Sequence, residues 1–423
     1  MYVSESRGST PAAASPTAAR GLRPGRRSAV ASTVLALGAV SLITDVSSEM
    51  VTAVLPLYLV TGLGLSPLGF GLLDGVYNGF SALVRLVGGH LADRGGRHKQ
   101  VAAFGYGLSA LCKPLLLAVH TLPLIGAVLA ADRTGKGLRT APRDALISLS
   151  SSPQDRGRAF GVHRAMDTTG ALLGPLAAFL ILRQAADGYD AVFTVSFCVA
   201  AVGVLVLLLF VPSRARKPAA PPAGEPAERP SLRAAVALLG RRELRGLALC
   251  AVALGLATVS DSFVYLMLQR RLGVPDRWFA LLPLGTAAAF LLLAVPLGRW
   301  ADRVGRWRVF VGGHLALLLA YALLLTQLHS GVLPYAVLAL HGTFYAATDG
   351  VLMAAAAGSV PEALRSSGLA LVQTGQAAAR FCCSIAFGAA WTAFGDRSAL
   401  AGAAVALLVS VGLSVRLRPA EAV

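Results

Sequence analysis

The sequence GHLADRGGR at residues 89–97 recurs as GRWADRVGR at residues 298–306. Both copies keep a first glycine, the triplet Ala-Asp-Arg, a second glycine and a final arginine in the same order. One copy lies in each half of the 423-residue chain, and apolar stretches flank both copies. Because internal similarity of this kind indicates structural repeats, we expect a fold made of two related halves.

The composition indicates that both halves lie in a membrane. Hydrophobic residues make up 55% of the chain and charged residues 14%, whereas about 25% of the residues in soluble domains are charged. A soluble fold could not hide so much apolar surface, and disorder of the whole chain is excluded for the same reason. Runs of about 20 apolar residues, the length that spans a bilayer, centre near residues 46, 78, 110, 134, 171, 201, 254, 288, 318, 344, 380 and 406. We therefore expect an all-α integral membrane protein, with twelve transmembrane helices in two pseudo-symmetric six-helix bundles.

Polar segments separate the predicted bundles. Residues 1–28 and the segment after residue 212 are rich in alanine, proline and arginine, a composition typical of disordered tails and linkers. The predicted organisation is a cytoplasmic tail at residues 1–28, a first bundle at 29–212, a cytoplasmic linker at 213–243, a second bundle at 244–416 and a cytoplasmic tail at 417–423.

The net charge of +17 fits this arrangement. A basic chain can indicate nucleic-acid binding, but lysine and arginine also mark the cytoplasmic loops of membrane proteins. Most basic residues fall on one side of the membrane when the N-terminus is cytoplasmic, and the exceptions include Arg270, Arg271 and Arg277. The pattern predicts cytoplasmic N- and C-termini and no nucleic-acid partner.

The five cysteines predict neither a disulfide framework nor a metal site. They show no CxxC spacing and no nearby pair of histidines, which structural metal sites require. We expect free thiols, no bound metal and no cofactor.

The repeated segment resembles the signature loop of the major facilitator superfamily, which lies between helices 2 and 3 and again between helices 8 and 9. The resemblance covers the chain after its N-terminal tail and implies two six-helix halves. It also implies that the loops close the cytoplasmic side of the outward-open state, through Gly89, Asp93, Arg94, Gly96, Arg97, Asp302, Arg303 and Arg306. Anchoring of the loops by their positive charge alone is the other interpretation. Residues 41–50 and 132–147 further resemble a bacterial subgroup of predicted permeases, which says little about the substrate.

The fifth predicted helix resembles the antiporter motif of exporters in this superfamily. The matching positions are Gly161, Gly170, Gly174 and Pro175, whereas Ala178 replaces a glycine that is usual in the motif. Small residues permit close helix approach, and proline weakens the helix backbone. The motif favours export, and generic helix packing is the other interpretation.

The first predicted helix carries two carboxylates. Asp45 and Glu49 have i,i+4 spacing, which places them on one helix face, where close like charges disfavour joint ionisation. If the helix begins near Ser32, Asp45 lies about 20 Å along it, past the middle of the membrane. Because ionisable groups at this depth are costly and mark functional sites, we expect the pair to exchange protons or bind a cation. A structural pairing with a cation of helix 4 or 5 is the alternative.

The fourth predicted helix carries several cations. Arg133 precedes Gly137 by four positions, as in a superfamily motif, and the resemblance implies that Arg133 faces the cavity and modulates the protonation of a nearby carboxylate. Lys136 is a further candidate for this coupling. Towards the cytoplasmic side we expect a salt-bridged inner gate formed by Arg139, Arg143, Asp144, Arg164 and Asp167. An anion-binding site built from the same cations is the alternative.

Other polar residues in the predicted helices are candidates for the wall of a central cavity. Asp261 and Asp349 give the second half its own carboxylates and are further proton-coupling candidates. Weaker candidates for substrate contact are Asp74, Lys113, His341, Tyr345, Gln373, Gln376 and Arg380.

These features predict a secondary active transporter that works by alternating access, first of all a proton-coupled antiporter that exports a drug-like molecule or a secreted metabolite. Proton-coupled uptake or exchange of an organic anion is the alternative. An integral-membrane enzyme is a remote alternative because HExxH and GxSxG are absent, and a sensor would need a soluble output domain. We expect a monomer in the bacterial inner (plasma) membrane, with a small-molecule substrate, protons and the lipid bilayer as its partners.

Overall fold

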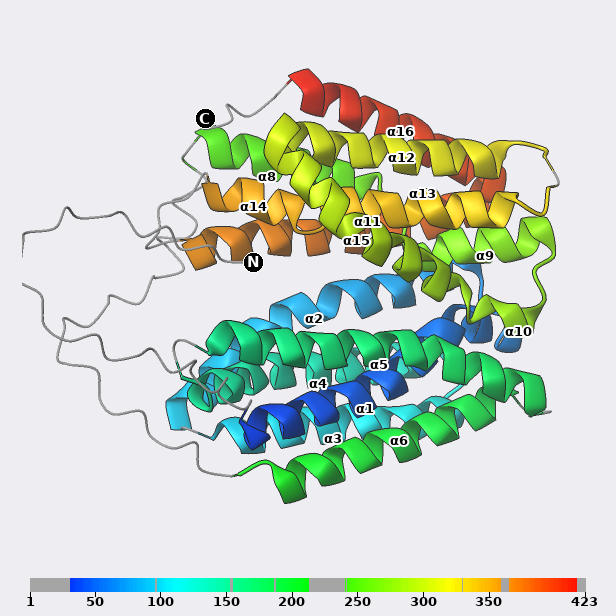
Figure 1. Ribbon diagram of the computed structural model, residues 1–423. Helices are drawn as coiled ribbons and strands as arrows, with labels where there is room; N and C mark the ends of the chain where they lie inside the picture. Colours follow the sequence, from blue (N-terminus) through cyan, green and yellow to red (C-terminus); the bar gives the residue numbers. More distant parts are fainter. Residues whose placement is uncertain are drawn as a thin grey trace, which may run out of the picture.

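The computed structural model describes residues 31–95, 97–152, 155–185, 188–212, 240, 242–328, 330–358 and 365–416. Six helices form the first half of the chain (Figure 1): α1 (Ser32–Leu57), α2 (Pro67–Gly95), α3 (His98–Ala118), α4 (Leu122–Leu149), α5 (Arg156–Gln184) and α6 (Gly188–Phe210). A π-helical turn, Tyr58–Gly62, extends α1. The predicted tails, most of the predicted linker and Gly96 lie outside the described residues.

The second half contains six further crossings, three of which are divided. These are α8 (Arg242–Leu256) with α9 (Asp261–Leu272), α10 (Asp276–Phe279) with α11 (Leu282–Val304), α12 (Arg306–Leu325), α13 (Leu333–Thr348) with α14 (Val351–Gly358), α15 (Arg365–Phe394) and α16 (Asp396–Arg416). All regular secondary structure in the described ranges is helical. The predicted fold class, with twelve crossings in two halves, is confirmed.

Nine stretches of described helix are long and apolar enough to cross a membrane by themselves. The crossings outside this group are α2, α4 and α13–α14. The α4 helix is diluted by charged side chains, and α13 is only 16 residues long. Polar groups inside a membrane are tolerated where they face other helices or a cavity, so the polar side chains of these three crossings are expected to point away from lipid.

Two of the divided crossings leave irregular backbone in the middle of the bundle. Residues 257–260 separate α8 from α9, and Asp349–Gly350 separate α13 from α14. Gly350 has φ of +61°, a left-handed conformation that glycine adopts without the penalty of a side chain. At membrane depth, irregular backbone is tolerated only where it is buried in protein or lines a cavity.

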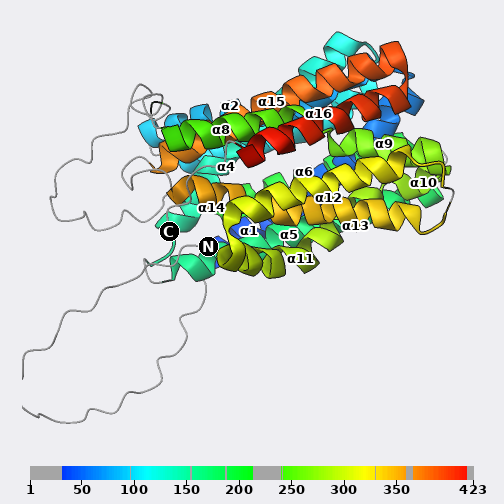
Figure 2. The same ribbon diagram turned by 90° about the horizontal axis from the view of Figure 1, so that it is seen from above.

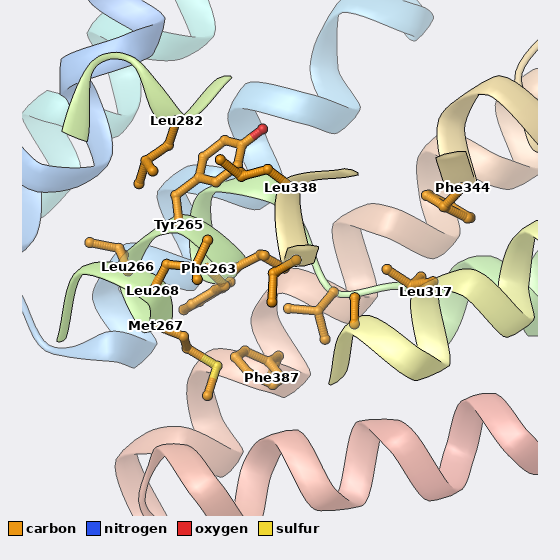
Figure 3. Packing of buried hydrophobic residues seen from close by; sticks show 14 of the residues in the cluster. Phe263, Tyr265, Leu266, Met267, Leu268, Leu282, Leu317, Leu338, Phe344 and Phe387 are labelled. Carbon is orange, nitrogen blue, oxygen red and sulfur yellow. The ribbon is translucent and has the colours of Figure 1, made fainter. Parts of the chain in front are cut away.

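The two halves meet mainly through α2 and α15, which lie side by side in both views (Figures 1 and 2). The early part of α2 packs on the late part of α15, where a Cβ on Gly75 would lie 3.2 Å from the Phe381 carbonyl oxygen. Next to this contact, the Phe263 ring packs edge-on against Phe70 and Phe387, with centroids 4.8 Å away in each case. Figure 3 shows Phe263 and Phe387 within this buried cluster.

These contacts lie at one end of the molecule. The α1 helix begins and α16 ends at the opposite end, whereas α10 lies at the end where the halves meet (Figure 1). A further contact there joins the halves, because the rings of Phe179 in α5 and Trp278 in α10 are 5.0 Å apart. The molecule is therefore held together at the α10 end.

Candidate functional site

A cavity of about 360 Å³ lies between the halves. Its wall in the first half comes from α1 and α2, and its wall in the second half includes both helix breaks. The polar and charged lining residues are Glu49, Thr52, Tyr77, Asn78, Thr258, Ser260, Asp261, Ser262, Tyr265, Thr286, Tyr345, Asp349, Arg380 and Ser384. The volume falls within the range of small-molecule sites, about 300–1,000 Å³, so the cavity is the candidate substrate site.

Asp261 organises the second-half wall. It occupies the first turn of α9, directly after the break, and its Oδ1 accepts a hydrogen bond from the Tyr345 hydroxyl of α13. The Nε2 of His341 lies 3.4 Å from the same oxygen. His341 is fully buried and stands behind this wall rather than in it, next to Asp261 on the protein side.

Asp349 and Arg380 lie beside the second helix break. Asp349 is exposed and follows the last residue of α13, while the Arg380 guanidinium of α15 lies 6.0 Å from the Tyr345 ring centroid. Both residues also line a smaller hollow of about 40 Å³, together with Gln376. Gln373 is exposed, and its amide donates to the Met353 sulfur at 3.5 Å.

The carboxylates of α1 face the cations of α4. An Arg139 guanidinium nitrogen lies 3.4 Å from Asp45 Oδ1, and Lys136 Nζ lies 3.8 Å from Glu49 Oε1. Asp45 and Arg139 are mostly buried, whereas the Glu49 and Lys136 side chains are 27% and 35% exposed. The structure therefore brings together the pairs that a structural role requires, and it also places one of the two carboxylates, Glu49, in the cavity wall.

The glycines of α5 pack directly on this part of α1. A Cβ on Gly170 would lie 3.1 Å from the Asp45 Cβ, and a Cβ on Gly174 would lie 2.6 Å from the Glu49 Cβ. Pro175 is buried beside them. Gly161 differs, because a Cβ there would meet nothing within 4 Å. Close helix approach thus explains two of the three motif glycines.

The predicted inner-gate residues of α4 and α5 pair within the first half. Arg143 lies 3.0 Å from Asp144 and 3.6 Å from Asp167, which also lies 3.5 Å from Arg164. The pair of Arg143 and Asp167 ties α4 to α5, the other two lie within one helix, and none of the three crosses to the second half.

The two repeated loops are described only in part. Asp302 and Arg306 form an exposed i,i+4 pair at 3.1 Å, and Arg97 and Arg303 are exposed. Gly89, Asp93 and Arg94 fall in a part of α2 whose side chains lie outside the described set.

Arg133 is placed differently from the expectation that it faces the cavity. Its guanidinium pairs with Asp132 and stacks 3.7 Å from the ring centroid of Tyr77. Tyr77 lines the cavity and Arg133 does not, so the arginine lies one layer behind the wall. Lys113 is buried in the same layer, where its Nζ donates to the Ser109 carbonyl at 3.0 Å.

Asp74 joins the halves at the edge of the cavity. It is buried in α2, and it accepts hydrogen bonds from Ser384 of α15 at 2.7 Å and from the Asn78 amide at 3.1 Å. Among the described residues, no basic group lies within salt-bridge distance of it. Asp74 is thus a buried carboxylate held across the interface by neutral donors.

Several wall residues were missed from the sequence, chiefly Thr52, Tyr77 and the polar neighbours of Asp261, which are Thr258, Ser260 and Ser262. The hydroxyls of Thr52 and Tyr77 are hydrogen-bonded, which fixes Tyr77 against the cavity. The stretch TVSDS at residues 258–262 interrupts an otherwise apolar run. That interruption is the signal that could have located the break between α8 and α9.

The sequence is similar to a known protein family. The family model described as Major Facilitator Superfamily matches residues 37–381. An uncharacterized MFS-type transporter of Methanocaldococcus jannaschii is 29% identical over 387 residues, which cover 89% of this chain and 92% of that protein. An uncharacterized protein of Mycobacterium tuberculosis is 34% identical over 185 residues, 44% of this chain and 45% of that protein.

Solved transporter structures share the fold at low sequence identity. A bacterial homologue of the human lysosomal transporter Spinster superposes with a TM-score of 0.74 at 14% identity, over 91% of this chain and 96% of that one. The nucleoside transporter NupG also reaches 0.74, at 16% identity over 91% and 98%. A peptide transporter POT variant reaches 0.69, at 15% identity over 92% and 95%. With its two six-helix halves, its central cavity and these matches, the chain belongs to the Major Facilitator Superfamily of transporters.

Proposed function

We propose that this protein exports a small molecule in exchange for protons, by alternating access of the central cavity to the two sides of the membrane. The observation that carries the proposal is the position of Glu49. This carboxylate lines the cavity and pairs with Lys136 of α4, one helical turn from the pair of Asp45 and Arg139. A group that can take up a proton therefore touches both the substrate space and the charge network of the first half.

Protonation changes the balance of this network. A nearby cation stabilises the ionised form of a carboxylate, and loss of either charge leaves the other uncompensated. When Glu49 takes up a proton, Lys136 loses its partner and the contact between α1 and α4 weakens. Proton binding and helix movement are thereby linked, as coupled transport requires.

Export is supported by the packing of α5 on α1. Gly170 and Gly174 hold the α5 backbone against the turn that carries Asp45 and Glu49. These glycines and Pro175 are the positions that resemble the antiporter motif of exporters. A contact this close transmits a shift of α1 to α5 directly, because neither helix has side-chain space to yield.

The alternative of organic-anion exchange finds less support in the geometry. Lys136, Arg139 and Arg143 each lie next to a carboxylate of the first half. None of the three lines the cavity. An anion in the cavity would have to draw these cations out of existing pairs.

The proposal includes the orientation and setting of the protein. The excess of lysine and arginine in the tails and linker supports cytoplasmic N- and C-termini, which puts the α10 end at the outer face of a bacterial plasma membrane. On this assignment the halves are closed on the outside. We propose that the functional unit is the monomer.

Everted membrane vesicles test the coupling. Respiration acidifies the vesicle interior, a fluorescent pH probe follows the gradient, and a compound that the protein exports should dissipate it. We expect Glu49→Gln and Asp45→Asn to abolish the response, because neither amide can carry a proton. Asp190→Asn is the matched control, since Asp190 is exposed and lies outside the cavity. Normal coupling in both α1 variants would overturn the proposal.

A further inference from the structure

The charges in the cavity wall are unbalanced. Three carboxylates line it, Glu49 from the first half and Asp261 and Asp349 from the second, and among the described lining residues Arg380 is the only lysine or arginine. A wall with this excess raises the local concentration of cations and disfavours anions. The excess negative charge of the wall therefore favours a positively charged ligand.

The α4 cations do not reverse this balance. Arg139 and Arg143 lie behind the wall in ion pairs, and Arg133 is separated from the cavity by the Tyr77 ring. Lys136 approaches the wall only through Glu49, at 3.8 Å. Even if Lys136 neutralises Glu49 fully, two carboxylates face one guanidinium.

The helix breaks add acceptors of the same sign. The α8 and α13 helices both end beside the cavity, and the last carbonyl groups of a helix carry partial negative charge. Thr258, two residues after the end of α8, and Asp349, the residue after α13, both line the space. The helix starts at the two breaks already have a carboxylate beside them, Asp261 in the first turn of α9 and Asp349 just before α14.

Aromatic rings complete the wall. Tyr77, Tyr265, Phe279, Phe290 and Tyr345 line the cavity from five helices of the two halves. Ring faces attract organic cations, by about 0.5–2 kcal/mol for each well-placed contact, and also accept flat apolar bodies. The combination fits an aromatic or apolar compound that carries positive charge.

From these observations we infer that the substrate is an organic cation with an aromatic or apolar body. Asp349 and Asp261 hold its charge at the two helix breaks, and the rings pack on its body. This inference rests on the proposed transport function of the same cavity. It excludes organic anions as the main substrate class, and it assigns substrate selection to the second half of the chain.

Equilibrium binding to the full-length protein in lipid nanodiscs tests the inference. The probes are ethidium and tetraphenylphosphonium, which carry permanent positive charge, and carboxyfluorescein, an aromatic anion of similar bulk. We expect both cations to bind and carboxyfluorescein not to bind. Asp349→Asn should weaken ethidium binding at least tenfold, about 1.4 kcal/mol. Asp349 is the variant of choice because it is exposed, so its replacement leaves the buried contacts intact.

The controls separate a local charge effect from loss of the fold. Asp190→Asn removes one carboxylate outside the cavity and should leave ethidium affinity unchanged, and thermal unfolding should be the same for both variants. Equal or tighter binding of carboxyfluorescein would overturn the inference. Absence of binding by both cations, or unchanged ethidium affinity in Asp349→Asn, would also overturn it.

The vesicle assay distinguishes failure of this inference from failure of the proposed function. If carboxyfluorescein dissipates the proton gradient and neither cation does, antiport stands and the assignment of an organic cation is wrong. If ethidium binds through Asp349 but moves no protons, the substrate class stands and proton antiport is wrong.

Discussion

One methyl group added at the contact between α2 and α15 should shift the equilibrium between the closed and the open state of the α10 end. Gly71 and Gly388 face each other there. A Cβ on Gly388 would lie 2.5 Å from the Pro67 carbonyl oxygen and 3.2 Å from the Gly71 Cα. Ordinary van der Waals separation is about 3.5 Å, so Gly388→Ala forces the two helices apart by about 1 Å.

The clash destabilises only the conformation in which the halves are closed at the α10 end. Overpacking by a methyl group costs about 1–3 kcal/mol. Alternating access separates the halves at the α10 end, and the clash then disappears. We therefore expect Gly388→Ala to shift the equilibrium towards opening at the α10 end by roughly 5–150-fold.

Distance measurements by pulsed electron paramagnetic resonance read this shift directly. Spin labels on Gln184 of α5 and Tyr335 of α13, both exposed near the α10 end, report the separation of the halves there. The matched control is Gly107→Ala in α3, where a Cβ meets nothing within 4 Å. The same distance distribution in Gly388→Ala and Gly107→Ala would refute the reasoning.

Three further outcomes follow from other contacts. Gly174→Ala should reduce transport and lower stability by about 1–3 kcal/mol, whereas Gly161→Ala should leave both nearly unchanged; transport rates and thermal unfolding of the pair decide this. Arg139→Ala strands the buried Asp45 carboxylate and should cost about 3–5 kcal/mol, so its thermal unfolding temperature should fall and Asp45→Asn should restore it. Asp74→Asn removes a buried charge without a described basic partner, so the closed α10 end should become more populated in the same spin-label measurement; a shift towards opening would contradict this account.

The helical framework could be predicted because apolar length and internal repetition are local properties of the sequence. The predicted helix centre near residue 171 falls within α5, and the centre near residue 406 falls in α16. The break between α8 and α9 was missed because hydrophobicity over a window of about 20 residues averages the polar stretch at residues 258–262 into its apolar flanks. The divided α13–α14 crossing was missed in the same way.

The site was predictable to the level of residue type and helix, and not beyond it. Spacing places Asp45 and Glu49 on one face of α1, but it does not say which helix that face meets. The carboxylates meet their cations on α4, and the glycines of α5 pack on the same part of α1; both are tertiary contacts. For Arg133 the decisive neighbour is Tyr77, a residue of α2 that no spacing within α4 could reveal.

The two halves share a sequence repeat but contribute different features to the site. The paired charges on α1, α4 and α5 all lie in the first half, whereas the second half holds the helix breaks and the exposed Asp349. A paired network responds to a proton by changing its partners, and a broken helix can respond to a ligand because its backbone ends lie at the cavity. We infer that the first half senses protons and the second half senses substrate. Coupling of proton binding to substrate binding then requires residues of the first half that contact the cavity or the second half. Two carboxylates meet this condition, Glu49 in the wall and Asp74 at the α2–α15 contact.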